Sequence, residues 1–137
     1  MRVVLISAEA SGHRLGQALA TELDATHLRL DLAAVGPVET LGLVSRALRT
    51  VRDVEATVLA MGADRVVTID APTLNLRLAA RLRRRGIRVL HWVSPQIWAW
   101  RGYRRHRIAR SVDALGCLLP FEPALYRDTG LHAVFTG

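Results

Sequence analysis

The chain of 137 residues has one cysteine and no lysine. It also has no apolar run of the roughly 18 to 20 residues that a membrane-spanning helix needs. One thiol cannot form a disulfide within the chain, and Cys117 lies in the apolar run DALGCLL, so we expect a buried structural thiol. The first residues lead straight into an apolar run, without the charged, apolar and small-residue order of a signal peptide. These absences predict a cytoplasmic protein of one domain.

Several cofactor and catalytic motifs are missing as well. Only Gly12 and Gly16 follow the first apolar run, so the chain has neither a dinucleotide-binding G-x-G-x-x-G nor a P-loop, which needs Gly-Lys-Ser/Thr. It has no G-x-S-x-G elbow for a nucleophilic hydrolase. The five histidines, at positions 13, 27, 91, 106 and 132, lack the spacing of metal ligands. We therefore expect no metal site and no cofactor.

Acidic residues are absent from one long basic window. Residues 71–112 contain eleven arginines and no Asp or Glu, and the formal net charge of the chain is +7. A surface of one sign favours an anionic partner, which could be nucleic acid, a phosphorylated substrate or an acidic membrane. The alternative is an arginine-rich surface that is merely solvated and binds no partner. The same window contains all three tryptophans, within HWVSPQIWAW (91–100).

Strand-like and helix-like segments alternate along the whole chain. Apolar or alternating runs predict strands at 2–7, 27–35, 65–70, 87–93, 113–119 and 132–137. Helical spacing or helix-end signals predict helices at 14–23, 36–63, 73–86, 103–111 and 120–128. This order predicts the α/β class: a Rossmann-like three-layer domain with a mostly parallel sheet covered by helices on both faces.

One predicted helix, 73–86, has two distinct faces. Three leucines share one of them and should pack on the sheet: Leu74, Leu78 and Leu82. Arginines recur about once per turn on the other and should face outward: Arg77, Arg81, Arg84, Arg85 and Arg88. If helix 103–111 lies on the same side, its arginines would extend this basic surface.

Ligands of such sheets bind beyond the carboxyl ends of the strands, so the residues that follow each strand are the candidates for a site. EASG (9–12) is expected to turn there, beside a helix N-terminus that favours an anion or a sugar hydroxyl. Asp70 ends a buried strand, where its carboxylate could act either as a helix cap or as a general base. Asn75, one turn later, would add an amide for hydroxyl recognition.

Taken together, these post-strand segments resemble the lipid-A-disaccharide synthase family, glycosyltransferases of lipopolysaccharide synthesis in bacteria. The matching segments occur in the family's order: AEASG (8–12), IDAPTLN (69–75), HWVSPQIWAWR (91–101), LLPFEPALY (118–126) and FTG (135–137). The chain has His13 where the family has the aspartate of SGD, and it is shorter between that loop and Asp70.

The resemblance implies one half of a GT-B architecture. Residues 1–137 would form the N-terminal, acceptor-side domain, and the C-terminal domain that holds the UDP-sugar would be absent. The implied reaction transfers 2,3-diacylglucosamine from its UDP derivative to 2,3-diacylglucosamine 1-phosphate, with inversion, to give a β-1′,6-linked disaccharide. The isolated chain should then be inactive, and a separately encoded C-terminal domain could complete it.

Asp70 is the expected catalytic base, acting on the acceptor 6-hydroxyl. The substrate-binding residues that we expect from the matching segments are Ser11, Gly12, Asn75, Ser94, Trp98 and Arg101. The arginines and tryptophans would face an acylated, phosphorylated substrate and an anionic membrane, which implies peripheral attachment to the inner face of the cytoplasmic membrane. Two other interpretations stay open: an inactive remnant of the synthase, and a nucleic-acid-binding module that stacks bases on Trp98 and Trp100. We expect no nucleic acid, because the aromatic residues are few.

Overall fold

The computed structural model describes residues 1–30, 41–99 and 102–137, and only the backbone of 41–44. Within these residues six strands form one sheet in the order β2-β1-β3-β4-β5-β6, and every neighbouring pair is parallel. The strands are β1 (Val3–Ser7), β2 (Thr26–Arg29), β3 (Arg65–Ile69), β4 (Arg88–Trp92), β5 (Ala114–Cys117) and β6 (His132–Phe135). The predicted parallel sheet is confirmed.

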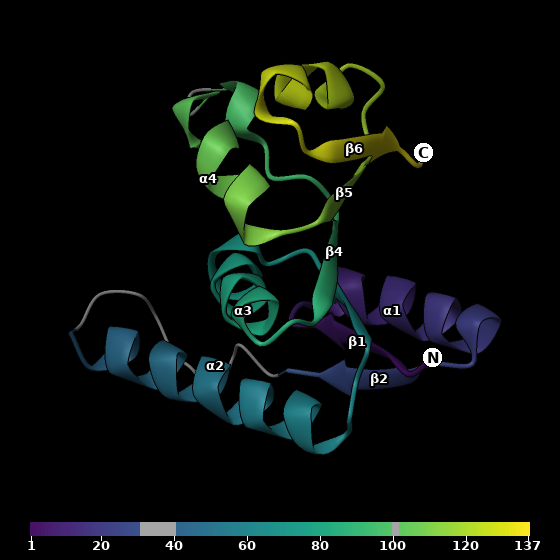
Figure 1. The fold of residues 1–137 in the computed structure, drawn as a ribbon, viewed down its shortest axis with the longest axis vertical. Helices are drawn as coiled ribbons and strands as arrows, with labels where there is room; N and C mark the ends of the chain where they lie inside the picture. The colour runs from purple at the N-terminus through teal and green to yellow at the C-terminus, as the bar shows by residue number, and fades with distance from the viewer. Residues whose placement is uncertain (31–40, 100–101) are drawn as a thin grey trace.

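Helices cover both faces of the sheet, as Figure 1 shows. The longer ones are α1 (Ala10–Leu23), α2 (Leu41–Ala60), α3 (Pro72–Arg84) and α4 (Arg105–Ser111). Short 3-10 helices follow later strands: η2 (Ile97–Ala99), η3 (Gly102–Arg104) and η4 (Glu122–Thr129). On one face Leu5 and Val67 pack against α1, and on the other Val4, Ile6 and Val66 pack against α2 and α3. The three-layer arrangement is confirmed.

The two faces of α3 are those that its sequence predicts. Leu74, Leu78 and Leu82 are buried in the main core cluster. Full burial of a leucine side chain contributes about 1.5 to 3 kcal/mol, so this face fixes α3 on the sheet. Arg77, Arg84 and Arg85 are exposed.

The predicted arginine stripe is wrong at its end, because Arg88 lies on strand β4 and not on the helix. The helix stops at Arg84, and the N–H groups of Arg85 and Gly86 donate back to carbonyls of Leu82 and Arg83. Gly86 has φ +82°, a left-handed conformation that glycine adopts without steric cost and that commonly ends helices. The chain then turns directly into β4.

Other boundaries differ from the sequence-based ones near the N-terminus. The turn expected at 9–12 is wrong: α1 begins at Ala10, and the N–H of His13 donates to the carbonyl of Glu9 over 2.8 Å, which closes the first helical turn across this segment. The predicted strand 27–35 is described only up to residue 30. The predicted start of helix 36–63 also lies outside the described residues.

Cys117 is fully buried at the end of β5, which confirms the structural thiol. Burial raises its pKa to about 11. The thiolate is the reactive form of cysteine, so this side chain is chemically inert near neutral pH.

His91 makes the stability of the fold depend on pH. Its ring is fully buried, with Nδ1 2.8 Å from Thr68 Oγ1, and burial lowers its pKa to about 4. The folded chain therefore keeps His91 neutral while the unfolded chain protonates it below its ordinary pKa near 6.5. We expect the free energy of unfolding to fall by about 3 kcal/mol from this residue alone as the pH drops from roughly 6.5 to 4.

Urea unfolding at a series of pH values measures this loss, and His91→Gln is the control. The glutamine variant should lose less stability on acidification than the unchanged chain. His27, whose pKa is lowered by burial and then by His13 and Arg29, adds to the loss in both proteins. Equal pH dependence of the two proteins would show that His91 is not responsible.

Candidate functional site

The parallel strands bring all their carboxyl ends to one edge of the sheet. Ser7, Ile69 and Trp92 end the adjacent strands β1, β3 and β4. The residues that follow them, which include Asp70 and Ser94, therefore line the same edge. This is the edge where ligands of open α/β sheets bind.

Asp70 occupies a strained turn between β3 and α3. Asp70 and Ala71 have φ values of +54° and +43°, which non-glycine residues adopt only at a cost of about 1 to 3 kcal/mol each. The Asp70 N–H donates to the carbonyl of Trp92 over 2.9 Å, and Oδ1 accepts the Ala71 N–H over 2.9 Å. The carboxylate is half-buried, and among the described residues Oδ2 has no hydrogen-bond partner. It is therefore held in place with one oxygen available.

Asn75 fastens this turn from inside the protein. The side chain is fully buried, and its Nδ2 donates to the carbonyls of Ile69 over 3.1 Å and Asp70 over 2.7 Å. Its Oδ1 has no partner among the described residues. The amide that the sequence suggested for hydroxyl recognition is thus used to hold the Asp70 turn.

A second strained position follows β4. Val93 has φ +77°, which is unusual for a β-branched residue, and the N–H groups of Val93 and Ser94 both donate to the carbonyl of Gly116. Ser94 is buried, and its Oγ lies 3.3 Å from the hydroxyl of Tyr126. Ser94 therefore ties the loop after β4 to η4.

At the first strand, the expected candidates lie on α1. Ser11 is exposed, and Gly12 is buried against Ile69 and Ser7, where an added Cβ would make ordinary 3.5 Å contacts. The glycine that lacks space for a side chain is Gly16, because a Cβ there would lie 2.5 Å from His27 Nε2. The sequence did not indicate a cluster of polar side chains between β1, β2 and α1. In it, Ser7 Oγ is 2.7 Å from both His13 Nδ1 and His27 Nε2.

Trp98 extends this edge with an exposed aromatic surface. It is 44% exposed and stacks edge-on against Phe121, with ring centroids 5.4 Å apart. Leu118 and Leu119 are exposed beside Phe121 in sequence. Arg101 and Trp100, which the sequence also indicated, lie outside the described residues.

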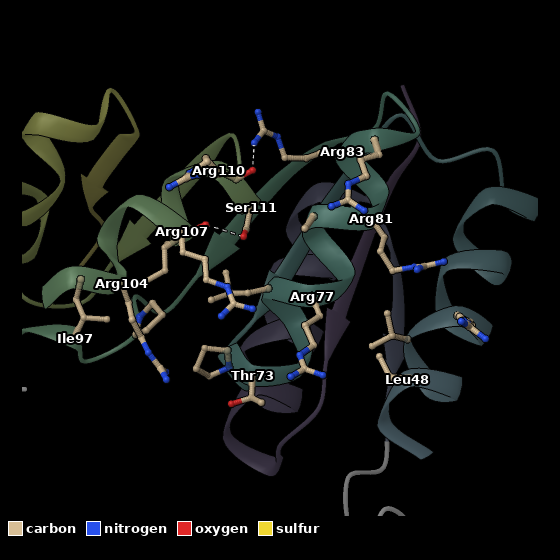
Figure 2. A pocket seen from close by; sticks show the side chains of 18 of the residues that line it. Leu48, Thr73, Arg77, Arg81, Arg83, Ile97, Arg104, Arg107, Arg110 and Ser111 are labelled. Carbon is tan, nitrogen blue, oxygen red and sulfur yellow. Dashed lines mark hydrogen bonds between the residues drawn. The ribbon is translucent and has the colours of Figure 1, made fainter. Parts of the chain in front are cut away.

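A groove of about 1310 Å³ begins at this edge and runs along α3, between α2 and the segment of η3 and α4 (Figure 2). Among the described residues, eight arginines and no acidic residue line it. They are Arg52, Arg77, Arg81, Arg83, Arg84, Arg104, Arg107 and Arg110. The arginines of α3 and α4 thus form one basic surface, which is the prediction for two helices on the same side of the sheet.

Carboxylates neutralise only some of these arginines. Glu55, buried on α2, accepts hydrogen bonds from Arg81 over 2.6 Å and from Arg85 over 3.1 Å. Burial opposes ionisation, but these two partners lower the pKa of Glu55 overall. Arg83 pairs with Asp113 over 3.1 Å. The other arginines of the groove have no ion pair within the described part of the chain.

The described residues contain no group of three or more His, Cys, Asp or Glu side chains arranged to hold a metal ion. None of the described helices is long and apolar enough to cross a membrane.

Comparison with known proteins points to one family. The sequence profile of a family described as lipid-A-disaccharide synthetase matches residues 26–137. A lipid-A-disaccharide synthase of Pseudomonas fluorescens (strain Pf0-1) is 34% identical over 159 aligned positions, which cover 100% of this chain and 42% of the relative.

Two further relatives carry the same name. The one from Cupriavidus pinatubonensis is 45% identical over 77% of this chain and 26% of the relative. The one from Burkholderia mallei (strain SAVP1) is 37% identical over 100% of this chain and 41% of the relative. The chain thus spans about two fifths or less of the length of these relatives.

Proposed function

This chain belongs to the lipid-A-disaccharide synthetase family, and from that premise we propose that residues 1–137 form the acceptor-side domain of a glycosyltransferase of lipid A synthesis. The proposed reaction transfers 2,3-diacylglucosamine from its UDP derivative to 2,3-diacylglucosamine 1-phosphate. The observation that carries the proposal is the held carboxylate of Asp70, at the ligand-binding edge of the sheet and within the family's segment IDAPTLN.

In this mechanism Asp70 acts as the general base. Its carboxylate removes the proton from the acceptor 6-hydroxyl as that oxygen attacks the anomeric carbon of the donor. The bond from this carbon to the phosphate oxygen of UDP breaks, and UDP leaves with the electron pair. Attack on the face opposite UDP inverts the anomeric centre and gives the β-1′,6 linkage.

The surrounding residues would have different tasks. Asn75 is fully buried, so its part is to position Asp70 rather than to touch the substrate. Ser94 is buried and would likewise hold its loop in place. Ser11 and Trp98 are exposed at the same edge and remain our candidates for direct contact with the acylated acceptor, together with Arg101. Gly12 is buried against Ile69 and Ser7, so its part would be to pack α1 on the sheet rather than to touch the substrate.

The donor requires a second domain. In a GT-B enzyme the reacting groups meet in a cleft between two domains, and this chain would supply only the acceptor side of it. The UDP-sugar-binding side would come from a second domain. We further propose that the domain works at the inner face of the cytoplasmic membrane, where exposed Trp98 and the arginine surface would meet acyl chains and anionic headgroups.

A chimaera tests the proposed function. Residues 1–137 replace the matching N-terminal part of the Pseudomonas fluorescens relative, and disaccharide formation is measured from the two acylated sugars. We expect product from the chimaera and none from residues 1–137 alone, because correct positioning of both substrates supplies much of the rate enhancement. A folded but inactive chimaera would contradict the proposal, and so would product formed by the isolated chain at rates typical of an enzyme.

A further inference from the structure

The arginines of the α2–α3–α4 groove divide into two groups. Arg81 reaches toward α2 and is neutralised by Glu55, and Arg83 is neutralised by Asp113. Figure 2 shows that the side chains of Arg77, Arg104 and Arg107 reach into the same end of the groove, around Thr73. None of these three has an ion pair within the described residues, so this end has three guanidinium groups without a counterion in that part of the chain.

The groove also has an apolar lining beside this charge. Its apolar residues come from all three walls: Leu48, Val51, Pro72, Leu76, Ala80, Pro95, Ile97 and Ile108. An inorganic anion would make no contact with this apolar lining. A single-stranded nucleic acid would need aromatic platforms for its bases, and none of the described residues that line the groove is aromatic. A ligand with both a phosphate and a hydrocarbon chain satisfies both surfaces.

We propose that this groove is a binding site for one anionic phospholipid of the membrane surface. Its phosphate would lie between Arg77, Arg104 and Arg107, because planar guanidinium groups bind phosphate oxygens in pairs. Thr73, exposed at the same end, would donate its hydroxyl. The first part of an acyl chain would cover Leu76, which is partly exposed, and Leu48, which is exposed. The volume of about 1310 Å³ exceeds the roughly 300 to 1,000 Å³ of ordinary small-ligand pockets, which leaves room for a headgroup and part of a chain.

This inference rests on the proposed membrane attachment, but it makes a narrower statement. A diffuse basic surface attracts anionic vesicles through its total charge, so the loss of any two exposed arginines should weaken attachment about equally. A defined site depends on particular arginines and becomes saturated at one lipid per chain.

Two double variants with the same change in net charge separate these cases. Arg77→Gln with Arg107→Gln removes the groove's phosphate ligands. Arg88→Gln with Arg127→Gln is the matched control, because both residues are exposed, lie outside the groove and have no ion pair among the described residues. Thermal melting verifies that each variant folds. Vesicle flotation and calorimetry measure binding to phosphatidylcholine mixed with phosphatidylglycerol, to phosphatidylcholine alone, and to short-chain phosphatidylglycerol in monomeric form.

We expect the groove variant to lose affinity for the mixed vesicles by about tenfold or more relative to the control variant, since it alone loses the charge-assisted hydrogen bonds to the phosphate. Short-chain phosphatidylglycerol should bind the unchanged chain with a stoichiometry of one, and inorganic phosphate should bind far more weakly. Equal losses in both variants would overturn the proposal in favour of a diffuse field. Tighter binding of a single-stranded RNA than of the lipid, lost in the groove variant, would overturn it in favour of a nucleic-acid site. Because the readout is binding by the chain itself, its failure would leave the proposed sugar transfer unaffected.

Discussion

Asp70→Asn is expected to lower the turnover of the active chimaera by on the order of 10² to 10⁴, because it removes a positioned general base from the reaction. The Michaelis constant for the acceptor should change much less, since the amide keeps the size and polarity of the carboxylate. The variant should also keep the local fold: an asparagine Oδ1 can still accept the Ala71 N–H, as Asp70 Oδ1 does over 2.9 Å.

The matched control is Asp113→Asn, which removes a carboxylate at the opposite end of the strands. Asp113 pairs with Arg83 and accepts the N–H of Val89, so it serves the fold rather than the site. The turnover per folded molecule of the Asp113→Asn chimaera should equal that of the unchanged chimaera. Turnover of the Asp70 variant equal to that of the unchanged chimaera would exclude Asp70 as the base.

Asn75→Ala is expected to destabilise the fold by about 2 to 4 kcal/mol. The substitution removes both donors to the carbonyls of Ile69 and Asp70, and each carbonyl left without a partner away from water costs about 1 to 3 kcal/mol. Since those bonds also hold two residues at positive φ, the Asp70 turn should relax toward an unstrained conformation. In the chimaera, turnover per folded molecule should fall too, although Asn75 is buried away from the substrate.

Urea unfolding measures the first effect and steady-state kinetics the second, with Gln17→Ala on α1 as the control that also removes a side-chain amide. Gln17 is exposed, so its removal should change stability by no more than about 0.5 kcal/mol. If the free energy of unfolding of Asn75→Ala lies within that range of the unchanged chain, the hydrogen bonds of Asn75 to the two carbonyls are not needed for stability. Normal turnover in a destabilised Asn75→Ala variant would show that Asn75 stabilises the fold but is not needed to position Asp70.

The sequence predicts the fold well because its strongest signals are long and periodic. The apolar runs around Val4, Val66 and Leu115 are buried strands, and the leucine face of α3 packs as its spacing requires. Boundaries were less predictable where a single residue decides them. Gly12 looked like part of a turn but lies within a helix, and Arg88 followed a helical spacing but lies on a strand, since Gly86 ends the helix between them.

The candidate site was predictable in position but not in its internal contacts. The carboxyl end of a strand made Asp70 a candidate, but no spacing rule indicates that Asn75 reaches back to the two carbonyls before α3. The contact of Ser7 with His27 joins residues 20 positions apart, and the pairing of β1 with β2 brings them together. The division of the arginines into neutralised and unpaired groups depends on Glu55 and Asp113, which lie on other elements.

The strand order also sets the pace at which this molecule can fold. The central pair β1 and β3 joins distant residues such as Val3 and Arg65, whereas the other parallel pairs join residues that are much nearer in sequence, such as Val4 and Thr26. The entropy of loop closure opposes such distant contacts, so we expect the β1–β3 pairing to form late and to slow the folding of the sheet. During that interval the apolar strands are exposed to other chains, and dilute, cool refolding conditions should give the highest yield of native protein.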